Sequence, residues 1–257
     1  MIQRSARPAP LRDFVWTLIR TDFKARYHGA ASGFVWALFK PVAMFVVLLS
    51  VFSFLFRDQT YLFNLMIGLF LWDFFSEGTR VGLESLFQKG FLITAAPFPR
   101  AVLVVTSIAN ALLTMTVFVV AILIVLSVTR GVPSPVAIAL FLLYLVLYVV
   151  IVIGFSLGAS VLFLKYRDLN QVWEVILQAG FFVAPIIYPL SILPEHLHKY
   201  LYLWPVTPVI QFSRQVLVEG KLPTFKAHCL LFAVTAVTFL AGYTLYRRYA
   251  PRAVERL

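Results

Sequence analysis

The chain has 257 residues, of which 61% are hydrophobic and 13% are charged, and its formal net charge is +11. Soluble domains contain about 25% charged residues, so this composition excludes a soluble fold and predicts an all-α protein that crosses a membrane several times. The basic residues lie beside the apolar runs, which favours membrane lipids or an anionic substrate over nucleic acid as partners. The single cysteine, Cys229, excludes an intrachain disulfide, and the four scattered histidines indicate no metal site.

The first segment, residues 1–32, is basic and amphipathic. Small residues follow from Gly29 to Gly33 and permit a sharp bend before a long apolar run. This order predicts an interfacial helix on the membrane surface, followed by a helix that crosses the membrane. The apolar residues of the first helix recur at helical spacing and share one face: Leu11, Phe14, Val15, Leu18, Ile19 and Phe23.

Long runs with few charges predict six membrane-spanning helices within a single domain, residues 1–257. Six spans place both termini on one side of the membrane. That side would hold 16 of the 22 Lys and Arg residues and the other side 6, so both termini are predicted to be cytoplasmic. The predicted spans are residues 33–56, 61–79, 102–129, 134–164, 172–190 and 228–246.

Two connections between the spans are too long for simple turns. Residues 80–97 predict a short amphipathic helix that ends at Gly90, either as a docking surface for a cytoplasmic partner or as a loop that packs on lipid. The second connection, 190–213, is apolar but rich in proline. Short re-entrant helices explain both properties better than two further spans, because each apolar piece is too short to cross the bilayer. The prolines in and around this segment are Pro185, Pro189, Pro194, Pro205 and Pro208, with Trp204 among them.

Charged and small residues inside the predicted spans indicate packing contacts. Asp73 and Glu77 lie one helical turn apart, and an ion pair from Glu77 to Arg80 is favoured over a proton-coupling role. Gly154 and Gly158 form a GxxxG pattern that is expected to hold two helices of this chain together, with dimerisation as the alternative. A further charged cluster is expected to form ion pairs where the fourth and fifth spans meet, and it consists of Lys165, Arg167, Asp168 and Glu174.

The sequence lacks the main motifs of ATP binding and metalloprotease catalysis. There is no GxxxxGK[ST] or HExxH pattern, and the one GxSxG match, residues 154–158, falls inside a predicted span, so the chain is not predicted to bind ATP phosphates itself or to act as an enzyme. A pore or transporter with cytoplasmic contact surfaces is the class that remains.

Five segments resemble one known family in their order and spacing along nearly the whole chain. The chain resembles the transmembrane permease of the ABC-2 type exporters that carry polysaccharides. These include the O-antigen exporters, with the exporters of capsular polysaccharide and teichoic acid as relatives. The segments are Asp22–Pro41, Leu92–Arg100, Lys165–Val172, Ala184–Glu195 and Trp204–Leu217.

The resemblance implies a homodimer in the bacterial inner membrane with two copies of a separate P-loop ATPase, which would bind the ATP and Mg that this chain does not. The substrate would be a lipid-linked, undecaprenyl-type polysaccharide, O-antigen in the first place, that crosses through a channel at the dimer interface. The segment 190–213 would hold the gate helices of that channel. The ATPase would contact a coupling helix at Glu84, Ser85, Leu86, Phe87, Gln88 and Lys89.

The resemblance also places the substrate's head group at the loop before the first span. The family commonly has Leu-Gly at the end of that loop, whereas this chain has Ser32-Gly33, so the bend is implied more firmly than any single contact. Basic residues there would attract a pyrophosphate. The implied head-group residues are Arg26, Tyr27, His28, Gly29, Ser32, Gly33 and Lys40.

Aromatic side chains in the spans are candidates for a channel lining, because aromatic rings stack on the apolar faces of sugars without holding any one sugar tightly. Lipid contact or core packing is the alternative for each of them. A stand-alone secondary transporter with Asp73 and Glu77 as a proton site, and a membrane-bound glycan enzyme, are the rival functions. The candidate aromatics are Phe45, Phe52, Phe70, Phe74, Phe75, Phe181, Phe182 and Tyr188.

Overall fold

The structure, a computed structural model, describes residues 11–27, 33–56, 58–95 and 98–251. Within these ranges every regular element is a helix. The longer helices are α2 (Val35–Phe52), α3 (Tyr61–Gln88), α5 (Ala101–Arg130), α6 (Pro135–Phe163) and α10 (Phe225–Tyr249). The shorter ones are α1 (Leu11–Tyr27), α4 (Gly90–Ala95), α7 (Leu169–Val183), the 3₁₀ turn η1 (Leu190–Ile192), α8 (Glu195–Leu201), α9 (Val206–Arg214) and the π-helical turn η2 (Gln215–Glu219).

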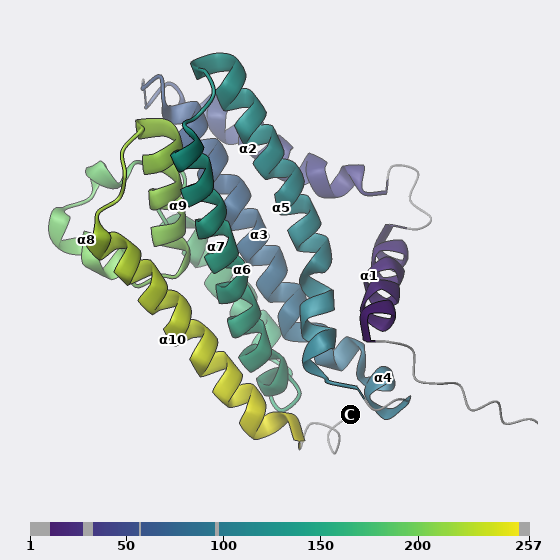
Figure 1. The fold of residues 1–257 in the computed structure, drawn as a ribbon. Coiled ribbons are helices and arrows are strands. Elements are labelled where there is room, and N and C mark those ends of the chain that lie inside the picture. Colours follow the sequence, from purple (N-terminus) through teal and green to yellow (C-terminus); the bar gives the residue numbers. More distant parts are fainter. Residues whose placement is uncertain (1–10, 28–32, 57, 96–97, 252–257) are drawn as a thin grey trace, which may run out of the picture.

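The long helices form a bundle around α3, which contacts α2, α5, α6, α7 and α9 (Figure 1). One end of the bundle holds α4 and the last turns of α10, and we call it the proximal end. The other end holds the connection 131–134 between α5 and α6, and we call it the distal end (Figure 1).

The core follows from the composition of α3. Its side chains from Leu65 to Leu71 are all buried, because this stretch is apolar on every face and other helices surround it. Two tyrosines of α6 complete the packing, and both are fully buried. The Tyr148 hydroxyl donates to the Leu71 carbonyl at 3.0 Å, so the one polar atom that Tyr148 brings into the core is satisfied.

Helices α6 and α10 pack closely through glycine. A Cβ atom added at Gly154 would lie 2.5 Å from the Cα of Phe239, and one added at Gly158 would lie 2.9 Å from the Cα of Gly242. Backbones approach this closely only where side chains are missing. The predicted GxxxG pattern is therefore confirmed as a contact between two helices of the same chain.

Four of the helices are long and apolar enough to cross a membrane, namely α2, α5, α6 and α10. They coincide within a few residues with four of the six predicted spans. Helix α3 has 28 residues, but Asn64, Asp73 and Glu77 lower its mean hydropathy. Helix α7 has 15 residues, a length of about 22 Å against the ~30 Å of a bilayer core. The described residues thus support a polytopic membrane protein with four clear spans, and the total of six stays a prediction.

The predicted span 172–190 was wrong at both ends. Helix α7 begins three residues earlier, at Leu169, and ends at Val183. Ala184 is extended, with φ −67° and ψ 137°, because it precedes Pro185. A proline therefore ends the helix well before the predicted boundary.

The predicted short helix at 80–90 was also wrong as a separate element. Helix α3 continues without a break from Tyr61 to Gln88, and only Lys89 separates it from α4. Gly78 and Gly82 lie near the expected break, but both pack against α6: a Cβ atom added at Gly78 would lie 2.9 Å from Val152, and one added at Gly82 would lie 2.1 Å from Ser156. Neither glycine breaks the helix. The segment that would contact an ATPase is therefore the end of a core helix.

Helix α1 packs along α5 near the proximal end (Figure 1). Its Leu18 is buried and its Phe14, Val15 and Ile19 are half-buried, whereas Arg12 and Arg20 are exposed. The ring centroids of Phe14 and Phe98 lie 4.7 Å apart. The apolar face predicted from periodicity is therefore the face that contacts the bundle.

The segment 190–213 contains the short helices α8 and α9. They have seven and nine residues, lengths of about 10 and 14 Å, so neither can cross a bilayer alone. All nine residues of α9 are buried, and α9 contacts α3 and α6. The α9 part of this segment therefore returns into the protein, whereas η1 and α8 have no buried residues and lie at its surface.

Candidate functional site

A small polar cavity lies where α1 ends and α2 begins. Its volume is about 130 Å³, and its walls come from α1, α2, α3 and α5. The structure brings together Arg26, Tyr27 and Lys40 of the predicted head-group residues with Asp73 and Glu77 of the second predicted span. We call it the head-group cavity.

Glu77 neutralises two arginines at this cavity. Its carboxylate accepts a hydrogen bond from Arg80 at 2.7 Å, one turn along α3, and a second from Arg26 of α1. The predicted pair between Glu77 and Arg80 is confirmed. Lys40 is exposed and forms no ion pair with any described residue, so it is the cation that remains available to an anion.

An aromatic cluster joins the end of α1 to the start of α2. The ring centroids of Phe23 and Tyr27 lie 4.8 Å apart, and that of Phe34 lies 5.4 Å from Tyr27. Gly33 has φ +36°, a left-handed value that a side chain disfavours. The end of the predicted bend is thus seen at Gly33, whereas His28, Gly29 and Ser32 lie outside the described residues.

Sequence reasoning missed the contribution of α5 to the cavity. Asn110 and Thr114 line it, and Thr106 lies one turn earlier on the same face. All three are buried in a helix that is mostly apolar. Polar residues spaced four apart in an uncharged span were the signal that could have revealed this face.

Replacing Glu77 with glutamine is expected to loosen α1 from the bundle. The substitution removes the charge that holds Arg26, and partly exposed pairs of this kind contribute no more than about 1 kcal/mol. Amide hydrogen exchange across residues 11–27 should become faster while the long helices stay protected. Glu84→Gln is the matched control, because Glu84 only accepts a hydrogen bond from Gln88 on its own helix. Equal exchange in both variants would show that this ion pair does not hold α1.

The predicted coupling residues divide into buried and exposed ones. Leu86 and Ser85 are buried, and Phe87 and Gln88 are exposed. Lys89 is largely buried and pairs with Asp22 of α1. Burial lowers the pKa of Lys89, and the Asp22 carboxylate partly counteracts this effect. Lys89 therefore ties α1 to the end of α3, and only part of the segment faces outward.

Arg167 stacks on this exposed surface instead of pairing with an acid. Its guanidinium carbon lies 3.8 Å from the centroid of the Phe87 ring and 5.7 Å from that of Phe163. Among the residues that the structure describes, no ion pair joins the charged cluster 165–174. The expected pairing there was wrong, because the exposed aromatic ring offers Arg167 a cation–π contact.

The candidate channel aromatics also divide by burial. Phe70, Phe74 and Phe75 are buried within the chain, where Phe70 stacks on Phe118 with centroids 4.1 Å apart. These three pack the core and do not face a surface of the chain. Phe45, Phe52, Phe181 and Tyr188 are half-buried, and Phe182 is 68% exposed.

Arg214 fixes the segment 185–214 to α3. Its guanidinium is buried and donates to backbone carbonyls, at 2.6 Å to Pro185 and at 2.8 Å to Ile186. It donates twice more to the carbonyl of Asn64, at 2.6 and 2.9 Å. The predicted gate residues differ in exposure. Pro185 and Pro208 are buried, and Pro194 is exposed. The half-buried ones are Pro189, Trp204 and Pro205.

Comparison with known proteins gives one consistent result. The family model described as ABC-2 type transporter matches residues 13–218. The chain is 24% identical to the O-antigen export system permease protein RfbA of Myxococcus xanthus, over 91% of this chain and 92% of that protein. It is also 24% identical to RfbA of Klebsiella pneumoniae, over 96% of each chain. The polysialic acid transport protein KpsM of Escherichia coli is again 24% identical, over 91% of this chain and 92% of KpsM.

Proposed function

Because this chain belongs to the ABC-2 type transporter family, we propose that it is the permease subunit of an ATP-driven exporter of polysaccharides. The observation that carries the proposal is the nearly full-length similarity to O-antigen export permeases and to a polysialic acid transport protein. These relatives are bacterial and differ in the polysaccharide they are named for. O-antigen is the substrate we propose, with capsular polysaccharide and teichoic acid as the alternatives.

The proposed assembly is a homodimer in the inner membrane with two P-loop ATPase subunits. Both termini would face the cytoplasm, as the distribution of Lys and Arg predicts. The proximal end would then be cytoplasmic. Its exposed Phe87 and Phe91, 47% and 69% exposed, form an apolar surface of the kind that proteins use to bind partners. We assign the ATPase contact to this surface, at the end of α3.

The head-group cavity supports a lipid-linked substrate. It lies toward the proximal end, and Lys40, which has no ion pair among the described residues, offers a cation beside the aromatic Tyr27 and Trp36. A volume of about 130 Å³ suits a phosphate group rather than a sugar chain. The polysaccharide itself would pass between the two copies, where the exposed Phe182 and the half-buried Phe45, Phe52, Phe181 and Tyr188 are the remaining candidates for the lining.

The proton-coupled transporter is less well supported. A proton site needs a carboxylate that can gain and lose its proton, but Glu77 is held by two arginines. Those contacts favour the charged carboxylate in a structural role. The rival would require Asp73 to act alone.

The proposal is tested by co-expression with each P-loop ATPase that a neighbouring reading frame encodes. We expect the tagged permease to retain the ATPase during purification, and deletion of the permease gene to remove polysaccharide from the cell surface. If no ATPase is retained, the exporter assignment fails. If the ATPase is retained but surface polysaccharide is unchanged by the deletion, the chain is an ABC-2 transporter of another substrate.

Phe87→Ala tests the ATPase contact. The substitution removes an exposed aromatic ring from the end of α3, and recovery of the ATPase should fall about tenfold, as is typical when an aromatic anchor is truncated. Phe54→Ala is the matched control. Phe54 is an equally apolar ring that is 81% exposed, but it lies in the connection between α2 and α3, away from the end of α3. Equal recovery from the two variants would place the ATPase elsewhere.

A further inference from the structure

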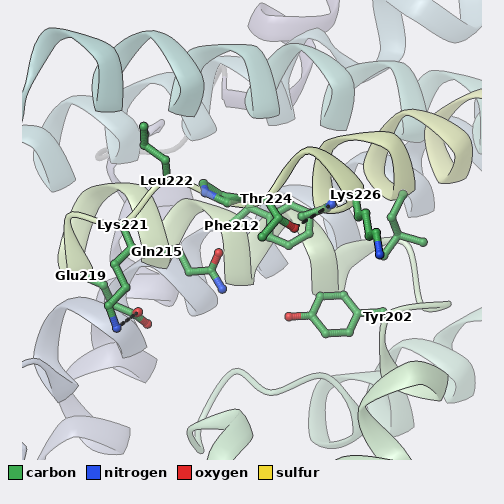
Figure 2. A pocket seen from close by; sticks show the side chains of 11 residues that line it. Tyr202, Phe212, Gln215, Glu219, Lys221, Leu222, Thr224 and Lys226 are labelled. Carbon is green, nitrogen blue, oxygen red and sulfur yellow. Dashed lines mark hydrogen bonds and ion pairs between the residues drawn. The ribbon is translucent and has the colours of Figure 1, made fainter.

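Two cavities at the distal end share one wall. The first has a volume of about 320 Å³ and lies between the start of α3 and residues 186–191. The second has a volume of about 570 Å³ and lies between η2 and the start of α10 (Figure 2). Tyr202, Gln215 and Glu219 line both. Both volumes fall within the roughly 300–1,000 Å³ of small-molecule sites, and we call the pair the distal groove.

Gln211 brings an unsatisfied donor to the groove. It lines the first cavity, is only 9% exposed, and its Nε2 has no hydrogen-bond partner among the described residues. A buried amide without an acceptor costs about 1–3 kcal/mol, so native proteins rarely retain one without a reason. A ligand oxygen in the cavity would supply the missing acceptor.

The π-helical turn shapes the shared wall. Helix α9 widens into η2 at Gln215, and the backbone N–H of Lys221 donates to the Gln215 carbonyl at 3.0 Å. Gly220 ends the turn with φ +65°, a value that glycine adopts without strain. Single π-turns of this kind occur frequently at functional sites, because they displace side chains from the regular helical position. Here the turn carries Gln215 and Glu219, both of which line the groove.

The lining chemistry selects a hydroxyl-rich ligand. Glu219 and Asp58 provide carboxylate acceptors, and hydrogen bonds from Thr60 lower the pKa of Asp58, so its carboxylate is charged at neutral pH. Lys221 and Lys226 line the second cavity as well, and Lys221 pairs with Glu219 at 3.4 Å (Figure 2). The lining therefore carries charges of both signs, and this many polar groups disfavour an acyl chain. The ring of Tyr202 faces the second cavity (Figure 2), where it offers a flat apolar surface beside these acceptors. Sugar residues combine hydroxyl donors with apolar C–H faces and match both.

We propose that the distal groove binds successive sugar residues of the polysaccharide as the chain leaves the membrane. This inference rests on the proposed function and adds a binding site that is separate from the head-group cavity. A groove of moderate polarity with two adjoining cavities holds several sugars weakly, and weak binding at several adjacent positions allows a moving chain to advance. The site belongs to a single chain and does not require the channel between two copies.

The test measures binding of oligosaccharides, prepared by mild acid hydrolysis of the cell-surface polysaccharide, to the permease–ATPase complex in nanodiscs. Tyr202→Ala should weaken binding about fivefold to tenfold through the lost ring contact. Gln211→Leu should weaken it as well without reducing thermal stability, because it removes an unpaired donor at similar volume. Glu219→Gln keeps the size of the side chain but removes its charge, and it should also weaken oligosaccharide binding if the carboxylate accepts hydrogen bonds from sugar hydroxyls. Tyr200→Ala is the matched control, since Tyr200 is 60% exposed and lines neither cavity.

The outcomes separate this inference from the proposed function. Weaker binding by all three groove variants, with normal binding by Tyr200→Ala, supports the groove. Equal binding by every variant, or no binding by a complex that still exports polysaccharide, overturns the groove and leaves the exporter assignment intact. A complex that folds, binds oligosaccharide in the groove and exports none contradicts the proposed function alone.

Discussion

A leucine in place of Gly242 is expected to prevent this chain from accumulating as a folded protein. A Cβ atom at that position would lie 1.7 Å from the carbonyl oxygen of Gly154 and 2.6 Å from its carbonyl carbon. Both are backbone atoms, so no side chain can turn away, and α6 and α10 must separate. Overpacking in a well-packed core costs about 1–3 kcal/mol even where side chains adjust, and the cost here should be larger.

The measurement is the yield of monodisperse protein after extraction in mild detergent, followed by thermal unfolding of what is recovered. Val237→Leu is the matched control, because Val237 lies on the same helix, is 67% exposed, and gains its methylene away from the bundle. Gly242→Ala should fall between the two. Wild-type yield and melting temperature for Gly242→Leu would show that the contact between α6 and α10 is not essential.

Replacing Arg214 with methionine is expected to produce the second large effect, detachment of the segment 185–214 from α3. The side chain is 4% exposed, and its four hydrogen bonds satisfy the carbonyls of Asn64, Pro185 and Ile186. Methionine fills a similar volume but leaves buried carbonyls without those donors, at about 1–3 kcal/mol each. Such a loss is a large share of the roughly 5–15 kcal/mol that stabilises a typical protein.

Thermal unfolding and limited proteolysis report this change. Protease should cut within 184–205 in Arg214→Met at concentrations that leave the wild type intact. Arg214→Lys should recover only part of the protection, because a single ammonium cannot reach all three carbonyls in the same geometry. Lys199→Met is the control for loss of a positive charge, since Lys199 is exposed. Wild-type protection in Arg214→Met would mean that other contacts hold the segment.

The sequence predicted best those parts of the fold in which the pattern of apolar and polar residues along one segment already determines how that segment packs. Four apolar runs became helices whose ends lie within a few residues of the prediction, because a long apolar segment has few alternatives to a helix in a membrane. The apolar face of α1 and the glycine face of α6 follow from helical periodicity alone. The ion pair between Glu77 and Arg80 is equally local, since the two residues are one turn apart.

The features that sequence missed depend on distant segments. Nothing in the sequence near Arg26 shows that it reaches Glu77, 51 positions later. The charges of 165–174 suggested ion pairs, but Phe87 from another helix offered Arg167 a different contact. The distal groove needs segments from α3 to α10 before Gln211 can be recognised as unpartnered.

The continuity of α3 has a mechanical consequence. The helix spans ~42 Å for its 28 residues. Phe87 lies near one end and Glu77 lies along its length. Near the other end, the Asn64 carbonyl accepts hydrogen bonds from Arg214. A stiff rod of this kind cannot bend locally to absorb a push. A tilt of about 10° around its midpoint moves each end by ~4 Å in opposite directions. A displacement of the helix at Phe87 is therefore transmitted to Asn64, 23 residues away, so α3 mechanically links the proximal and distal ends of the bundle.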